Sequence, residues 1–194
     1  YACKELARTM SAPREPCWQQ LKRFGRYLLG FPRLVYRYAW SKPSTVLRVE
    51  SDSDYAGCNL SRKSTSAYCM FWGKGWVKHS SKNQTTIATS TQEAEFYSVT
   101  GAAAAAIGVQ SLLSDLGVTV SIELHSDASA GIALSIRLGL GRAKHIAVQW
   151  LWLQKFVQNK EGKVLKISTK INTSDLCTKV LDIQRVLSLL QLMG

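Results

Sequence analysis

Acidic residues are scarce in this chain of 194 residues, which has 13 Asp and Glu against 25 Lys and Arg. The formal net charge of +12 indicates a polyanionic partner, with nucleic acid the first candidate and a generally basic soluble surface the alternative. The five cysteines are odd in number, scattered and without a CxxC pair. This argues against a zinc site and a disulfide framework, and it fits a reducing compartment.

Targeting and membrane signals are also missing. We find no signal peptide, and we expect no apolar run long enough to span a bilayer, so no membrane partner is predicted. The chain begins at Tyr1 within a helix-like pattern, without an initiator Met. We therefore expect a piece cut from a longer polyprotein or multidomain enzyme. The length predicts one domain, or one domain plus a fragment, and the hydrophobic fraction of 46% is enough for a core.

The sequence divides into two parts. Residues 2–29 have a helical pattern that is broken at 11–13 and ends at Gly30 and Pro32. A boundary is predicted near 41–44. The second part predicts the order β-β-β-α-β-α-α-β-α, which is an α/β fold with a sheet of mixed strand directions and helices on its faces. The expected strands are 46–51, 64–72, 76–80, 120–126 and 164–168, and the expected helices are about 90–116, 128–138, 144–159 and 173–193.

The few acids fall at strand ends and helix starts. Asp52 and Asp127 follow predicted strands, Glu93 and Glu95 lie in the first turns of the long helix, and Asp175 opens the last helix. Sites gather at such positions in α/β sheets, and clustered carboxylates favour Mg²⁺ or Mn²⁺. Each acid alone also has a structural explanation, because Asp stabilises turns and acids suit helix N-termini.

Five segments occur in a fixed order: SDSDYAG running on to RKSTSAY (51–57 and 62–68), VKHSSKNQTTIATSTQEAEF (77–96), LHSDASAGIAL (124–134), RAKHI (142–146) and SDLCTK (174–179). Together they resemble the ribonuclease H domain of copia-type LTR retrotransposon reverse transcriptases. Residues 44–194 are similar to that domain, and residues 1–43 resemble the segment that connects it to the polymerase. The resemblance implies a ribonuclease H-like fold with a mixed five-stranded sheet.

The resemblance implies a catalytic set of four metal-binding carboxylates, namely Asp52, Glu95, Asp127 and Asp175, with two Mg²⁺ or Mn²⁺ ions expected. Glu93 is the alternative to Glu95, since two residues two apart on a helix point about 200° from each other. Glu95 is favoured because it leads the apolar stripe of Val99, Ala102, Ala106 and Leu113, which should pack on the sheet. Asp54 is interpreted as a turn or supporting residue.

The expected function is metal-dependent cleavage of the RNA strand of RNA/DNA hybrids during reverse transcription. One alternative is a catalytically inactive hybrid-binding module that supports a polymerase, and another is a related two-metal nuclease of the integrase type. The expected partners are the hybrid and the polymerase part of the same polyprotein, in cytoplasmic retroelement particles or the nucleus. Candidate substrate-binding residues, weighed against solvated or helix-start polar positions, are Arg62, Lys63, Ser64, Asn83, Gln84 and His145.

Overall fold

The structure is a computed structural model that describes residues 1–33, 35–139, 146 and 151–193. One sheet has the strand order β3-β2-β1-β4-β5. β1 pairs antiparallel with β2 and parallel with β4, so the sheet is mixed, as the sequence predicts. The strand bounds are Val46–Asp54 for β1, Thr65–Trp72 for β2, Gly75–Asn83 for β3, Ser121–Ser126 for β4 and Gly162–Lys166 for β5.

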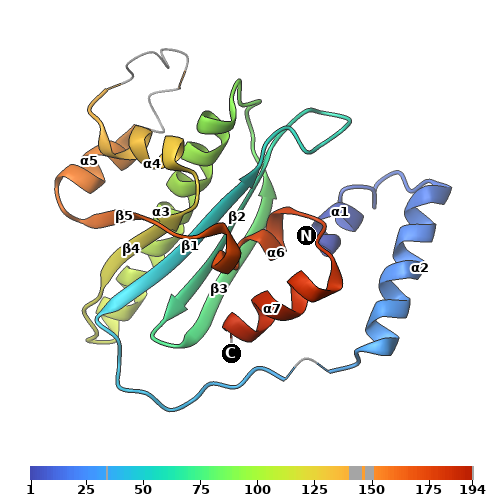
Figure 1. The fold of residues 1–194 in the computed structure, drawn as a ribbon, viewed down its shortest axis with the longest axis horizontal. Helices are drawn as coiled ribbons and strands as arrows, with labels where there is room; N and C mark the ends of the chain where they lie inside the picture. The colour runs from blue at the N-terminus through green and yellow to red at the C-terminus, as the bar shows by residue number, and fades with distance from the viewer. Residues whose placement is uncertain (34, 140–145, 147–150, 194) are drawn as a thin grey trace.

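Helices cover both faces of this sheet (Figure 1). On one face α3 packs against β1, β2 and β4, with α4 and α5 beside it, and on the other α6 packs against β1 and β2. The predicted class, a mixed five-stranded sheet flanked by helices, is confirmed. The helix bounds are Thr91–Asp115 for α3, Ser129–Ile136 for α4, Trp152–Gln158 for α5, Asp175–Thr178 for α6 and Ile183–Met193 for α7.

The long helix α3 begins and ends as its sequence dictates. The Ser90 side chain accepts a hydrogen bond from the Glu93 amide at 3.2 Å, which caps the first turn. At the other end Gly117 has φ +77°, and the Val118 amide donates to the Leu113 carbonyl at 2.8 Å, a Schellman closure. Between these ends an apolar face packs on Leu47, Val49, Ile122 and Leu124 of the sheet, all at most 1% exposed.

α3 also corrects one expectation. Among the described residues it is the one helix long and apolar enough to cross a membrane by length and composition, so the prediction that no run is long enough was wrong. Half of its most apolar window is buried inside the protein. Its hydrophobicity is that of a core helix packed against a sheet and α4.

Two predicted boundaries differ from the structure in ways that matter for the site. β1 continues to Asp54 because the polar residues 52–54 still pair with β2, Asp52 opposite Ala67 and Asp54 opposite Thr65. The single closing helix predicted over 173–193 is two helices, α6 and α7. Lys179 between them is extended, with φ −125° and ψ 158°. The predicted helix over 144–159 is described in part, as α5; its other residues, except Ile146, Leu151 and Asn159, lie outside the described ones.

The N-terminal residues form α1 (Ala2–Ala7) and α2 (Glu15–Gly30), followed by an extended segment that leads to β1. α1 lies close to the β2–β3 hairpin, where Lys4 Nζ donates to Thr65 Oγ1 at 2.7 Å and to Asn83 Oδ1 at 3.0 Å. α2 has no buried residue, and Figure 1 shows it standing apart from the sheet.

Candidate metal centre

Three of the four predicted carboxylates converge where β1 and β4 end beside the start of α3. Asp52 lies on β1, Glu95 in the second turn of α3 and Asp127 directly after β4. Each offers one oxygen atom, and these oxygens all lie within 4.8 Å of one another. Asp52 and Glu95 are buried, at 2% and 7% exposure, whereas Asp127 is partly exposed. The cluster is therefore buried at Asp52 and Glu95 and accessible to solvent at Asp127.

Contacts of α3 with β1 and with α4 hold Glu95 at this position. Ser98, one turn further along α3, donates from its hydroxyl to the Asp52 carbonyl at 2.6 Å, which ties the helix to β1. On the opposite side α4 approaches closely at Gly131, where an added Cβ would lie 2.9 Å from Glu95 Cβ. A larger residue at Gly131 would clash with Glu95 and force α4 or the glutamate to shift, so glycine suits this position beside the site.

Glu93, the alternative glutamate, has a different role in the structure. Its Oε2 accepts hydrogen bonds from the Thr89 amide at 2.7 Å and the Thr89 hydroxyl at 2.8 Å, and the Tyr97 hydroxyl donates to its Oε1. It therefore stabilises the first turn of α3. Among the described residues, the Glu95 Oε2 atom is by contrast buried without a hydrogen-bond partner. An orphaned buried carboxylate oxygen needs an explanation, and a cation ligand is one.

The electrostatics of the cluster agree with a cation site. Burial, and then the nearby charges of Asp52 and Asp127, raise the pKa of Glu95 to about 8. Burial raises the pKa of Asp52 to about 6, although Lys179 and the Thr178 hydrogen bond oppose the shift. Buried like charges are costly unless a cation compensates them. Two or three carboxylate oxygens are the ligands that hard divalent ions prefer.

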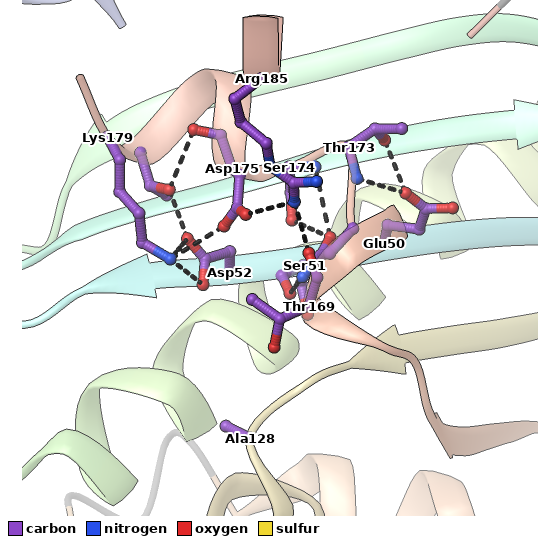
Figure 2. A network of polar contacts seen from close by, with 12 residues as sticks. Glu50, Ser51, Asp52, Ala128, Thr169, Thr173, Ser174, Asp175, Lys179 and Arg185 are labelled. Carbon is purple, nitrogen blue, oxygen red and sulfur yellow. Dashed lines mark hydrogen bonds and ion pairs between the residues drawn. The ribbon is translucent and has the colours of Figure 1, made fainter. Parts of the chain in front are cut away.

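The fourth predicted carboxylate, Asp175, is joined to Asp52 through the side chain of Lys179 (Figure 2). The Lys179 ammonium is 2.8 Å from Asp175 Oδ1 and 3.1 Å from Asp52 Oδ2. Arg185 Nη2 is 3.1 Å from Asp175 Oδ2. Asp175 is thus linked to Asp52 by a cation of the protein itself. Sequence reasoning missed both Lys179 and Arg185, because it treated residues 173–193 as one helix that carries them away from β1.

Another buried acid, Glu50, holds the segment before α6 in place. Glu50 Oε2 accepts from the Thr173 amide at 2.8 Å and the Thr173 hydroxyl at 2.6 Å (Figure 2). Arg48 Nη1 is 2.9 Å from Glu50 Oε1. Asn172 Nδ2 donates to the Ser51 carbonyl at 3.2 Å. These contacts position Asp175. The strand pattern of RVESDSD could have predicted that Glu50 lies near the site, because Glu50 and Asp52 are two positions apart and share a face of β1.

The predicted substrate residues separate into two groups. Arg62 is exposed and Lys63 half-buried in the loop between β1 and β2, and Asn83 is half-buried at the end of β3. Ser64 and Gln84 are buried, at 0% and 8% exposure. Their contact with substrate stays a prediction, and His145 lies outside the described residues.

The ties of these two buried residues explain their burial. Ser64 Oγ accepts from the Ala56 amide at 3.1 Å, which braces the loop after β1. Gln84 Nε2 donates to Ser66 Oγ and to the Ala94 carbonyl, both at 2.8 Å, which connects the hairpin to α3. Asp54, interpreted as a turn residue, is half-buried at the end of β1, and its carboxylate lies against the backbone of Gly57 in the turn that follows.

Comparison with known proteins gives consistent relatives along nearly the whole chain. No protein-family model matches the sequence. The chain is 32% identical over 182 residues to the Retrovirus-related Pol polyprotein from transposon TNT 1-94 of Nicotiana tabacum, which covers 93% of this chain and 14% of that protein. It is 31% identical over 185 residues to the Retrovirus-related Pol polyprotein from transposon RE2 of Arabidopsis thaliana, covering 93% and 13%.

Among solved structures, the chain is similar to the N-terminal RNase H domain of Rv2228c from Mycobacterium tuberculosis. The sequence identity is 8% and the TM-score 0.48, over 70% of this chain and 91% of that domain. The Pol polyproteins are much longer than the present chain, which spans 14% and 13% of their lengths.

Proposed function

The chain belongs to the copia-type family of retrotransposon Pol polyproteins, and we propose that it is a ribonuclease H. The proposed reaction is cleavage of the RNA strand of RNA/DNA hybrids, and it depends on divalent metal ions. The observation that carries the proposal is the convergence of Asp52, Glu95 and Asp127 within 4.8 Å, with one Glu95 oxygen buried and unpartnered among the described residues. Such a cluster suits a cation that also meets a phosphate.

The residues present fit two ions, Mg²⁺ or Mn²⁺. Asp52, Glu95 and Asp127 would hold one, and Asp52 with Asp175 would hold the other. When bound, the ions supply an activated water and charge stabilisation for the leaving 3′ oxygen. The chain itself orients these ligands: Ser98 ties α3 to Asp52, and Glu50 fixes the segment that carries Asp175. Because Asp52 and Glu95 are buried, the protein would exclude bulk water from one side of a bound phosphate.

The basic surface would guide the hybrid to this acidic cluster. With a net charge of +12, the chain is expected to bind the phosphate backbone in a salt-dependent manner. Arg62 and Lys63 lie in the loop that follows β1 and are proposed phosphate contacts, with Asn83 beside them. Distinction of RNA from DNA would come from contacts with 2′-hydroxyl groups. The proposed setting is a retroelement particle in the cytoplasm, or the nucleus, together with the polymerase part of the polyprotein.

The test is cleavage of an end-labelled RNA/DNA hybrid by the purified chain with Mg²⁺. We expect RNA fragments with 5′-phosphate and 3′-hydroxyl ends, no cleavage in EDTA, and loss of cleavage in Asp52→Asn. Asp115→Asn, which changes an exposed acid at the far end of α3, is the matched control and should keep full activity.

An intact hybrid at every Mg²⁺ and Mn²⁺ concentration would refute the proposal. Hybrid binding that survives EDTA without cleavage would favour the inactive binding module instead, and cleavage of double-stranded DNA would favour an integrase-type nuclease.

A further inference from the structure

Lys179 occupies an unusual position for a lysine. Its Nζ lies 2.8 Å from Asp175 Oδ1, 3.1 Å from Asp52 Oδ2 and 3.3 Å from Asp52 Oδ1, so one ammonium joins both carboxylates (Figure 2). Both acids are buried, at 2% and 3% exposure. The position follows from the end of α6 at Thr178, after which the extended backbone of Lys179 turns the side chain back toward β1.

The two halves of the acidic site are therefore unequal. In the half formed by Asp52 and Asp175, the cations of Lys179 and Arg185 already balance the carboxylates. In the half formed by Asp52, Glu95 and Asp127, a Glu95 oxygen is buried without a partner among the described residues. The first half is neutralised by the protein, and the second is built to receive a cation from outside.

Lys179 is also able to leave. Its side chain is 37% exposed, whereas the Asp175 and Asp52 side chains are 5% and 2% exposed. A lysine is a point charge on a flexible four-carbon stem, so it can exchange one anionic partner for another without moving the backbone. The phosphate of an incoming hybrid would be such a partner.

We propose that Lys179 is an exchangeable cation that fills the Asp52–Asp175 position until a divalent ion displaces it, so that the site takes its two ions in sequence. This inference rests on the proposed two-ion function and assigns a role to a residue outside the carboxylate set. The first ion enters at Asp52, Glu95 and Asp127. The second enters only when the lysine moves away, which makes the weaker site dependent on Lys179.

The decisive experiment is a Mn²⁺ titration without nucleic acid, followed by the electron paramagnetic resonance signal of free Mn²⁺. We expect the wild type to bind one ion tightly and a second weakly, and Lys179→Met to bind the second at least about tenfold more tightly, because an opposing cation is removed from its ligands. Lys163→Met removes the same charge at an exposed position on β5 and should titrate like the wild type. Equal affinities in all three proteins would overturn the inference.

Thermal unfolding separates this role from that of a purely structural lysine. Lys179→Met should have a lower Tm than the wild type in EDTA, where two buried carboxylates face each other, and should recover most of the difference in saturating Mg²⁺. A structural lysine would give the same deficit in both conditions. Lys179→Arg keeps the cation and protects the test against misfolding; it should behave like the wild type in EDTA and bind the second ion weakly.

These readouts do not depend on cleavage. If the wild type cleaves hybrid but Lys179→Met binds metal as the wild type does, the inference fails and the proposed function stands. If neither the wild type nor any variant cleaves hybrid while the metal titrations follow the expected pattern, the proposed function fails and the exchange by Lys179 stands.

Discussion

At the scale of residues, the structure gives different roles to two glutamates that lie two positions apart in sequence. Glu93 accepts hydrogen bonds from Thr89 and Tyr97, whereas Glu95 faces Asp52 and Asp127. The sequence favoured Glu95 because it leads the apolar stripe of α3. Helix periodicity was enough to place it on the sheet side, but only the fold could show that the Glu93 oxygens have partners of their own.

Matched substitutions at these two positions should have opposite effects. Glu95→Gln should lower Mg²⁺ affinity by at least about tenfold, yet in EDTA at pH 8.5 it should be as stable as the wild type or more so, because it removes a buried charge. Glu93→Gln should cost about 1–3 kcal/mol of stability by disturbing a buried hydrogen-bond set, with metal affinity retained. Urea unfolding and calorimetric Mg²⁺ titration measure the two effects. The assignment of Glu95 fails if Glu93→Gln is the variant that loses metal.

The raised pKa values predict how stability depends on pH when no metal is present. The pKa of Glu95 is raised from 4.5 to about 8 and that of Asp52 from 3.8 to about 6, in both cases mainly by burial. The folded protein therefore binds more protons than the unfolded chain within these windows. This contribution to stability is fully present below the unfolded pKa values and is lost as pH rises toward 8.

We accordingly expect Tm in EDTA to fall between pH 5 and pH 8.5 more steeply for the wild type than for Glu95→Gln. Saturating Mg²⁺ should remove most of the slope, because metal binding favours the ionised carboxylates and releases their protons. Differential scanning calorimetry across this range measures both curves. Parallel curves for the two proteins in EDTA would contradict the assignment of the raised pKa to Glu95.

At the scale of elements, most of the sheet and the long helix could be predicted from the sequence, and the break between α6 and α7 could not. Leu176, Val180, Ile183 and Leu187 recur at helical spacing, so the pattern predicts one continuous helix. Two tertiary features interrupt it. Lys179 turns back to Asp52 and Asp175, and Asp182 starts a new helix by accepting a hydrogen bond from the Arg185 amide at 2.9 Å.

The segment that leads into α6 depends on Glu50, whose substitution is the next prediction. In Glu50→Ala the amide and hydroxyl of the buried Thr173 lose their shared acceptor, and each unsatisfied donor costs about 1–3 kcal/mol. Since this segment carries Asp175, metal affinity should fall together with stability. Glu50→Gln keeps an acceptor and should lose less of both. Urea unfolding and Mn²⁺ titration test this, and a stability loss without any change in Mn²⁺ binding would show that Glu50 does not position Asp175.

At the scale of the whole molecule, the proposed boundary at residues 43 and 44 divides two parts that contact each other at several points. The extended segment before β1 contacts the hairpin: Tyr38 donates from its hydroxyl to the Trp76 carbonyl at 2.9 Å, and the Trp76 amide donates to the Tyr36 hydroxyl at 3.2 Å. Tyr36 also donates to the carbonyl of Met193 in α7. An apolar groove of about 1420 Å³ lies between α1, the hairpin and α7. A change from helical to strand-like pattern could locate the boundary, but these contacts between distant segments leave no periodic signal in the sequence.

Truncation at this boundary is therefore expected to weaken the domain rather than leave it unchanged. A chain of residues 44–194 loses the hydrogen bonds of Lys4, Tyr36 and Tyr38 and opens the groove to solvent, so its free energy of unfolding should fall by at least about 2 kcal/mol. Its sheet and acidic cluster depend on contacts within 44–194 and should persist, so Mn²⁺ should still bind. A chain lacking only residues 1–13 keeps Tyr36 and Tyr38 and should show an intermediate loss. Equal stability in urea of the full chain and both truncated chains would mean that the N-terminal residues contribute no packing to the domain. Loss of Mn²⁺ binding in 44–194 would mean that the functional unit begins before residue 44.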